Sequence, residues 1–281
     1  MSLIRRQLGA LFFAAVGAAL ALGSTDAGTL DKVRQDKALR IAFRDDAPPF
    51  SFTDATGLPA GFMIDLCRSV AKHIGEQLSI PDLKVSYVLV TAESRFDAIE
   101  TGKADLLCEP TSATLSRRET VDFSITTFVD GASLLVASDG PSDFAALSGK
   151  KIGVLAGTTT EQSLRNTLSS ANVAAEVVPA KTHGDGLAML DKGEIVAYFA
   201  DRAILSYLAS KSSDASKLRL ADNYFSLEPY ALALPHGDED FRLSLGHFGS
   251  SRPQRRAQSG KAETKYRVFN VSLGCIWSPN V

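Results

Sequence analysis

Short apolar segments typical of β-strands alternate with helical patterns along most of this chain, and this order constrains the fold more than any other feature. Residues 39–43 form the first such strand, and residues 61–74 carry apolar side chains at helical spacing. A strand at 83–90, a helix from Arg95 and a strand ending at Cys108 follow. Such βαβ order produces largely parallel sheets with helices on both faces. The sequence therefore predicts an α/β protein.

The alternation continues in the second half of the chain, so we expect two similar lobes. A strand at 132–137 precedes a second α/β round that begins at residue 151, and a strand at 230–234 returns the chain to the first lobe. We expect two crossing strands, near Val136 and residues 225–229, with a cleft between the lobes. The expected division is residues 28–135 with 229–243 for the first lobe and 136–228 for the second.

Both ends of the chain differ in character from the lobes. Arg5 and Arg6 precede an apolar run at 8–22 that is too short to span a membrane comfortably, so residues 1–27 are expected to be a secretory signal peptide. Residues 244–281 are rich in Ser and Gly and lack periodicity, which predicts a disordered or frameshifted tail. The mature protein is thus expected outside the cytoplasm. Its formal net charge of −2 argues against a nucleic-acid partner.

The three cysteines permit two interpretations. Cys67 and Cys108 are candidates for a disulfide in an oxidising compartment, which leaves Cys275 unpaired. The alternative is that Cys67 and Cys108 are two buried free thiols. No Cys or His pair has the spacing of metal ligands, so we expect no metal site and no cofactor.

Polar side chains cluster where the predicted strands end, which is where ligands bind in open α/β sheets. The stretch T-S-A-T-L-S-R-R-E-T-V-D-F-S at 111–124 combines hydroxyls with an arginine, a set suited to binding a carboxylate. An aspartate at another strand end suits an ammonium group. The candidate ligand-binding residues are Arg44, Ser112, Arg117, Ser124, Thr126, Thr158, Thr159, Thr160, His183 and Asp201. Each also has a purely structural interpretation, as a helix cap, a loop residue or a solvated surface charge.

Several motifs together resemble the solute-binding proteins of polar amino-acid ABC importers, from about Leu39 to Leu243. They are D-x-A-P-P-F-S-F, G-F-M-I-D-L, R-F-D-A-I-E-T-G-K-A-D, T-L-S-R-R-E-T-V-D-F-S, L-S-G-K-K-I-G-V and V-A-Y-F-A-D. The resemblance implies the type II periplasmic-binding-protein fold, with two βαβ lobes joined by two crossing strands. It also implies a small-molecule amino-acid ligand, an inner-membrane ABC permease as partner and a monomeric protein without enzymatic activity.

Within this family the chain is most similar to the glutamate/aspartate-binding subgroup, through Arg44, Cys108 and the motif A-K-T-H-G-D at 180–185. The resemblance implies that Arg117, helped by Ser112, binds the α-carboxylate and that Asp201 binds the α-ammonium. Arg44 and His183 would contact an acidic ligand side chain. The remaining hydrogen-bond donors would be Ser124, Thr126, Thr158, Thr159 and Thr160.

Two departures and two rival functions remain open at this point. Pro110 replaces the small residue usual in the hydroxyl-rich turn, and the chain after Leu243 lacks the family's closing helices. An enzyme such as a periplasmic cyclohexadienyl dehydratase would need a general acid in the cleft, for which Glu109 or Glu161 is available. A receptor sensor domain is the other rival. The sequence does not rank glutamate against aspartate, glutamine or another dicarboxylate.

Overall fold

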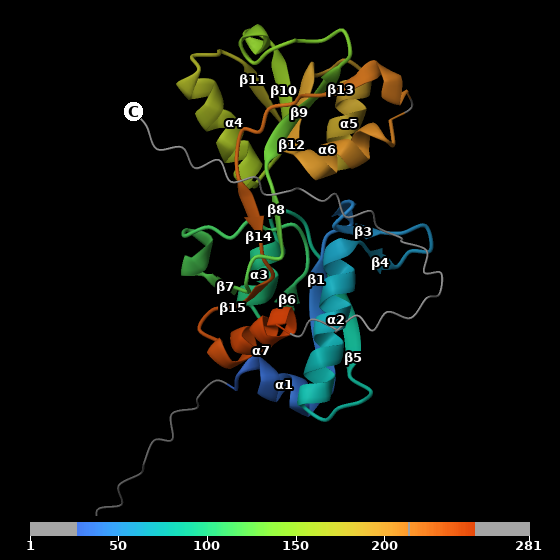
Figure 1. Cartoon of the computed structure of the whole chain (residues 1–281), viewed down its shortest axis with the longest axis vertical. Coiled ribbons are helices and arrows are strands. Elements are labelled where there is room, and N and C mark those ends of the chain that lie inside the picture. The colour runs from blue at the N-terminus through green and yellow to red at the C-terminus, as the bar shows by residue number, and fades with distance from the viewer. Residues whose placement is uncertain (1–26, 213, 251–281) are drawn as a thin grey trace, which may run out of the picture.

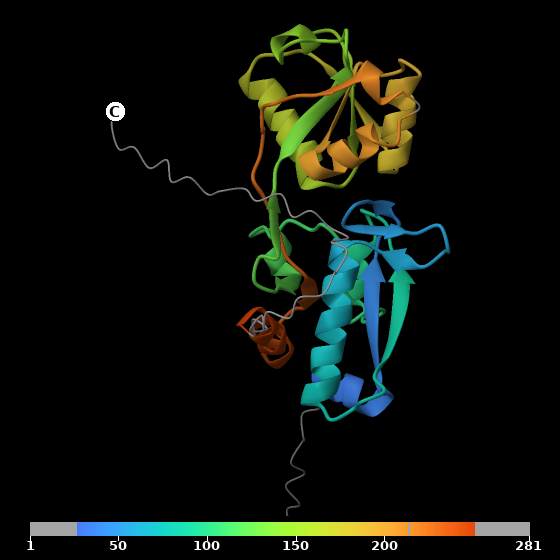
Figure 2. The same ribbon diagram turned by 45° about the vertical axis from the view of Figure 1, so that its right-hand side comes forward.

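The computed structural model describes residues 27–212 and 214–250, and these form two lobes connected by two strands (Figures 1 and 2). Each lobe contains a five-stranded sheet with helices packed beside it. The expected α/β architecture with two lobes is therefore confirmed. No helix among the described residues is long and apolar enough to cross a membrane.

The first lobe is built around β1 (Ala38–Phe43), which lies between the parallel strands β5 (Lys84–Leu89) and β6 (Leu106–Leu107). β15 (Ala233–Pro235) pairs antiparallel with β6 and with β7 (Val121–Phe123). Its other elements include α1 (Thr29–Asp36), β2 (Asp46–Ala47), β3 (Ser51–Thr53), β4 (Pro59–Ala60), α2 (Phe62–Gln77), α3 (Arg95–Glu100) and a short 3-10 helix (Arg117–Glu119).

The second lobe repeats this strand order. β10 (Lys151–Leu155) lies between the parallel strands β11 (Glu176–Ala180) and β12 (Ala197–Asp201), and β9 (Ala132–Ala137) pairs antiparallel with β12. The remaining elements are α4 (Thr159–Ser170), α5 (His183–Asp191), α6 (Arg202–Ala209), β13 (Leu218–Leu220) and two short 3-10 helices (Ala145–Leu147 and Ala215–Lys217). Because the parallel strands of a lobe end at one edge of its sheet, the polar residues that follow them are brought together.

Two antiparallel strands, β8 (Phe128–Asp130) and β14 (Glu228–Tyr230), connect the lobes (Figure 1). The first crossing therefore lies at β8 and not near Val136, because all of β9 is paired within the second sheet. The boundary expected between residues 135 and 136 thus falls inside β9. Gly131 follows β8, and a Cβ there would lie 2.3 Å from the Ser226 carbonyl oxygen, so the crossing strands approach too closely for a side chain.

The chain after Leu243 is helical where the structure describes it. α7 (Glu239–Ser250) continues through the residues that we expected to begin a tail, and Ser244 and Leu245 are each only 4% exposed. The expected boundary at residue 244 is therefore wrong, because an apolar face that includes Phe241 and Leu245 packs into the first lobe. The rest of the expected tail, 251–281, and residues 1–26 of the expected signal peptide lie outside the described residues.

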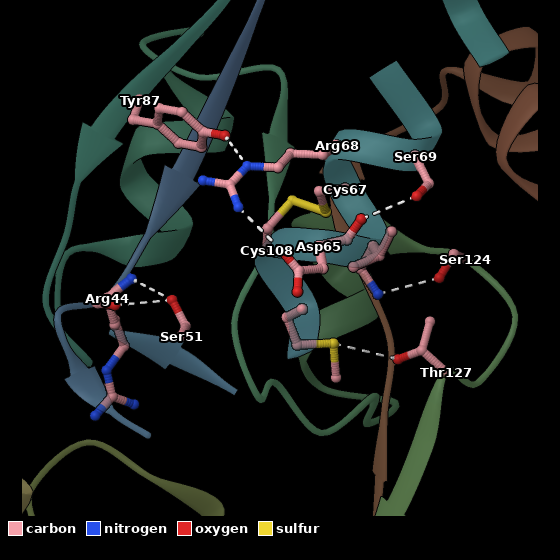
Figure 3. Close-up of a disulfide and its surroundings, with 12 residues drawn as sticks. Arg44, Ser51, Asp65, Cys67, Arg68, Ser69, Tyr87, Cys108, Ser124 and Thr127 are labelled. Atoms are coloured by element: carbon pink, nitrogen blue, oxygen red, sulfur yellow. Dashed lines mark hydrogen bonds and ion pairs between the residues drawn. A yellow bond between two sulfur atoms is a disulfide. The ribbon is translucent and has the colours of Figure 1, made fainter. Parts of the chain in front are cut away.

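A disulfide joins Cys67 of α2 to Cys108, the residue directly after β6 (Figure 3). Of the two interpretations, the disulfide is the one confirmed, and Cys275 lies outside the described residues. Both cysteines are fully buried. The bond fixes the end of β6 to the longest helix of the first lobe, and the next residue along the chain is Glu109.

Candidate ligand-binding site

A cavity between the two lobes collects most of the predicted site. Its volume is about 20 Å³, so it has room for about one water molecule, and the lobes or side chains must move to admit an amino acid. Eight of the ten candidates line it: Arg44, Ser112, Arg117, Thr158, Thr159, Thr160, His183 and Asp201. Arg95, Pro110 and Ile204 complete the lining.

Ser124 and Thr126 do not reach this cavity. The Ser124 hydroxyl donates to the Ile125 carbonyl at 2.8 Å and accepts from the Leu232 N–H at 3.0 Å, so it holds the strands of the first lobe together. Thr126 is exposed to solvent. The reason is topological, because both follow β7, which is the outermost strand of its sheet.

Arg44 is buried at the end of β1 and is held from two sides. Its backbone N–H donates to the Ser51 hydroxyl at 3.1 Å, and that hydroxyl donates to the Arg44 carbonyl at 2.8 Å (Figure 3). Its guanidinium pairs with Asp46 at 2.7 Å and with Glu109 at 3.4 Å. Arg44 is therefore a buried cation of the cavity wall and not a solvated loop residue.

Arg95, the first residue of α3, is a third arginine of the cavity that the sequence interpretation missed. It is 3% exposed, and its Nε lies 3.5 Å from Glu109 Oε1. Its Nη1 is buried and has no hydrogen-bond partner among the described residues. Burial lowers the pKa of the Arg95 guanidinium to about 10, against the opposing attraction of Glu109. The sequence did carry a signal for this burial, because Arg95 lies three and four residues before the buried Ala98 and Ile99 and therefore on the same face of α3.

The side chain of Arg117 bonds back to the backbone of the hydroxyl-rich turn to which it belongs. Its Nη1 donates to the Ser112 carbonyl at 2.7 Å, and its guanidinium lies 5.2 Å from the centre of the Phe96 ring. Burial lowers the pKa of the Arg117 guanidinium. Arg117 also lines an open groove of about 750 Å³ that runs along α4, so it lies where the cavity meets the solvent.

His183 is fixed by Tyr198 within the second lobe. Its Nδ1 lies 3.0 Å from the Tyr198 hydroxyl, and a Cβ on Gly186 would lie 2.1 Å from the Tyr198 ring. Burial lowers the pKa of the His183 imidazole to about 3, and the Arg44 charge acts in the same direction. The imidazole is therefore neutral near pH 7. When Tyr198 donates to Nδ1, Nε2 carries the proton and is available as a hydrogen-bond donor.

Asp201 ends β12 and is the only carboxylate among the described residues that line the cavity. Its Oδ1 is shielded from solvent and has no hydrogen-bond partner among the described residues. Burial raises the pKa of the Asp201 carboxyl to about 8, and the nearby Glu228 and Asp130 add to the rise. A cation placed beside this group would favour its ionised form.

Comparisons with known proteins agree with this geometry. Residues 39–248 match the model of bacterial extracellular solute-binding proteins, family 3. The chain belongs to this family. The L-glutamate/L-aspartate-binding protein of Pseudomonas aeruginosa is 31% identical over 217 residues, which make up 76% of this chain and 72% of that protein. The glutamate/aspartate import solute-binding protein of Escherichia coli is 28% identical over 244 residues, covering 85% and 81%.

A solved structure supports the same assignment. An ancestral amino acid-binding protein, a precursor of cyclohexadienyl dehydratase, superposes with a TM-score of 0.69 and 28% identity over 78% of this chain and 91% of that one. The expected periplasmic-binding-protein fold is thereby confirmed. The curated relatives named above are solute-binding proteins, and the matching family is one of extracellular solute-binding proteins.

In this solute-binding protein the three threonines after β10 have different tasks. Thr158 caps α4, because its hydroxyl accepts from the Glu161 N–H at 3.1 Å. The Thr159 hydroxyl donates to Glu228 at 2.9 Å, and Glu228 also accepts from the Ser112 hydroxyl. The backbone N–H groups of Thr159 and Thr160 belong to the first helical turn, where a helix offers donors to anions.

Proposed function

We propose that this protein binds an acidic α-amino acid, such as glutamate or aspartate, between its lobes and delivers it to an ABC permease of the inner membrane. The observation that carries the proposal is that Arg117 of the first lobe and Asp201 of the second line one cavity. An α-amino acid presents a carboxylate and an ammonium on neighbouring atoms, which matches this pair. The glutamate- and aspartate-binding relatives support the ligand class.

Each end of such a ligand has its own partners. The α-carboxylate would lie against Arg117, Ser112 and the first turn of α4, and the ammonium against Asp201. Arg44, Arg95 and the neutral His183 would donate to the side-chain oxygens, because all three line the same cavity as Arg117 and Asp201. Guanidinium groups bind carboxylates through paired hydrogen bonds.

Transport requires the lobes to open and close about the crossing strands. The cavity of about 20 Å³ is smaller than an amino acid, so the ligand enters an open form and closure excludes water from the charges. The expected signal peptide and the Cys67–Cys108 disulfide support a periplasmic location, where disulfides persist. We propose that the protein acts there as a monomer.

The dehydratase alternative receives no support from its two candidate acids. Glu109 is fully buried between Arg44 and Arg95. Glu161 accepts from the Gly157 N–H at 3.0 Å and pairs with Arg165 at 2.8 Å. Neither carboxyl group lines the cavity, so neither is placed to protonate a ligand there.

A thermal-shift screen tests the proposal. Glutamate and aspartate should raise the melting temperature, because a ligand that binds only the folded state stabilises it. Glutarate lacks the ammonium and γ-aminobutyrate lacks the α-carboxylate, so neither should produce the shift. Equal shifts for glutamate and glutarate would contradict the role of Asp201, and no shift with any amino acid would refute the proposed function.

A further inference from the structure

Glu109 is a fully buried carboxylate placed directly behind the arginines of the cavity. Its Oε2 lies 3.4 Å from Arg44 Nη1, and its Oε1 lies 3.5 Å from Arg95 Nε. Arg44 has a second internal partner in Asp46, at 2.7 Å. The guanidiniums of Arg44 and Arg95, which line the cavity and are proposed to bind the ligand side chain, are therefore accompanied by two carboxylates of the protein itself.

This arrangement changes what the arginines select. A charged ligand carboxylate gains from the two positive charges but is repelled by Glu109 and Asp46, and charges interact strongly where water is excluded. The hydrogen-bonding capacity remains, because Arg95 Nη1 is buried and has no partner among the described residues. An amide oxygen accepts that hydrogen bond as a carboxylate oxygen does, without adding a negative charge.

We propose that Glu109 is a specificity-determining residue that removes the preference for a charged side chain, so that the site binds α-amino acids whose side chain ends in either a carboxylate or a carboxamide. The proposal rests on the proposed function and refines its ligand class. Glutamate and glutamine are the matched pair of ligands that differ in this group alone.

The test is calorimetric titration of glutamate and glutamine into the wild-type protein and Glu109→Gln. In the wild type, the two dissociation constants should differ by less than about tenfold. In Glu109→Gln, glutamate should gain at least about tenfold over glutamine, since an internal negative charge has been removed beside the arginines. A purely structural role of Glu109 would change both affinities by the same factor.

Asp105→Asn is the matched control. Asp105 is also buried and pairs with an arginine, Arg40, at 2.5 Å, but it lies at the other end of β6, outside the cavity lining. Its substitution removes the same charge from the same lobe and should leave the glutamine-to-glutamate ratio unchanged. A ratio that shifts equally in both variants would overturn the proposal.

Two further outcomes are decisive. A wild-type preference for glutamate over glutamine above about a hundredfold would overturn the proposal. This outcome is measured on the wild type alone, so it can be obtained even if Glu109→Gln fails to fold. An unchanged ratio in a folded Glu109→Gln protein would overturn it as well, while glutamate binding would leave the proposed function intact. Failure of the wild type to bind either amino acid would instead refute the proposed function, and this inference with it.

Discussion

The carboxylate of Asp46 in the first lobe accepts a hydrogen bond from the backbone N–H of His183 in the second lobe, at 3.3 Å. His183 is the first residue of α5, so the negative charge lies at the positive end of the helix dipole. Asp46 also pairs with Arg44 at 2.7 Å. The protein therefore contains an interlobe contact that involves no ligand atom and joins Asp46 to His183, which lines the cavity.

Replacing Asp46 with alanine should shift the free protein toward an open form. The contact exists only in the closed form, and a hydrogen bond to a charged group contributes about 1.5–3 kcal/mol. Its loss therefore destabilises the closed form relative to the open form. Small-angle X-ray scattering should show a larger radius of gyration than in the wild type. Asp45→Ala is the control, because Asp45 is the exposed neighbour with the same charge. Equal radii for all three proteins would contradict the interlobe role.

Ligand binding should release a proton from Asp201 at neutral pH. The pKa of this carboxyl is about 8 in the free protein, chiefly because of burial, and the ligand ammonium would lower it. Affinity should therefore rise with pH up to about 8, by at most about tenfold per pH unit, and then level off. Calorimetry in two buffers of different ionisation enthalpy measures the released proton. A binding enthalpy independent of the buffer would contradict this.

The raised pKa of the Asp201 carboxyl also predicts how the stability of the free protein depends on pH. Because its pKa is raised on folding, the folded state binds a proton that the unfolded state has lost, so stability falls as the pH rises from about 4 to 8. Asp201→Asn removes this dependence. The free variant should melt at a higher temperature than the wild type at pH 8 and at the same temperature near pH 4. A lower melting temperature at pH 8 would show that the carboxylate stabilises the free protein.

Gly186→Ala should weaken ligand binding through Tyr198. The new Cβ would lie 2.1 Å from the Tyr198 ring, whose hydroxyl fixes His183, so the ring must move. Overpacking of this kind costs about 1–3 kcal/mol of stability. Gly184→Ala, where the nearest atom lies 3.7 Å away, is the control in the same helix. Thermal unfolding and ligand titration of both variants check this, and equal behaviour would contradict the positioning role.

Much of this fold was predictable because its elements obey simple periodicity. Strands such as β1 and helices such as α2 carry apolar residues at the spacing that their burial requires. The site residues at strand ends followed from the topology, since parallel strands end at one edge. The crossing near Val136 was misplaced because β8 and β9 are separated only by Gly131, and a sequence does not show which sheet a strand joins.

Arg95 was missed at the site, and Glu109 was named only as a candidate acid, because both are charged groups buried by tertiary packing. Arg95 begins an amphipathic helix and Glu109 follows a cysteine, and the sequence around them does not show that they pair with each other inside the first lobe. Ser124 was predicted in the site from resemblance, but its hydroxyl is used between strands of the first lobe. Local pattern specifies secondary structure, whereas partners distant in sequence decide which charges become buried.

The central claim is that one cavity holds an amino acid by its α-carboxylate and its ammonium, and titration of glutamate into Arg117→Ala tests it most directly. Arg118→Ala is the control, because Arg118 is adjacent in sequence but exposed. We predict at least about a hundredfold loss of affinity in Arg117→Ala, since a buried carboxylate loses its cation, and wild-type affinity in Arg118→Ala. Unchanged glutamate affinity in a folded Arg117→Ala protein would contradict the account.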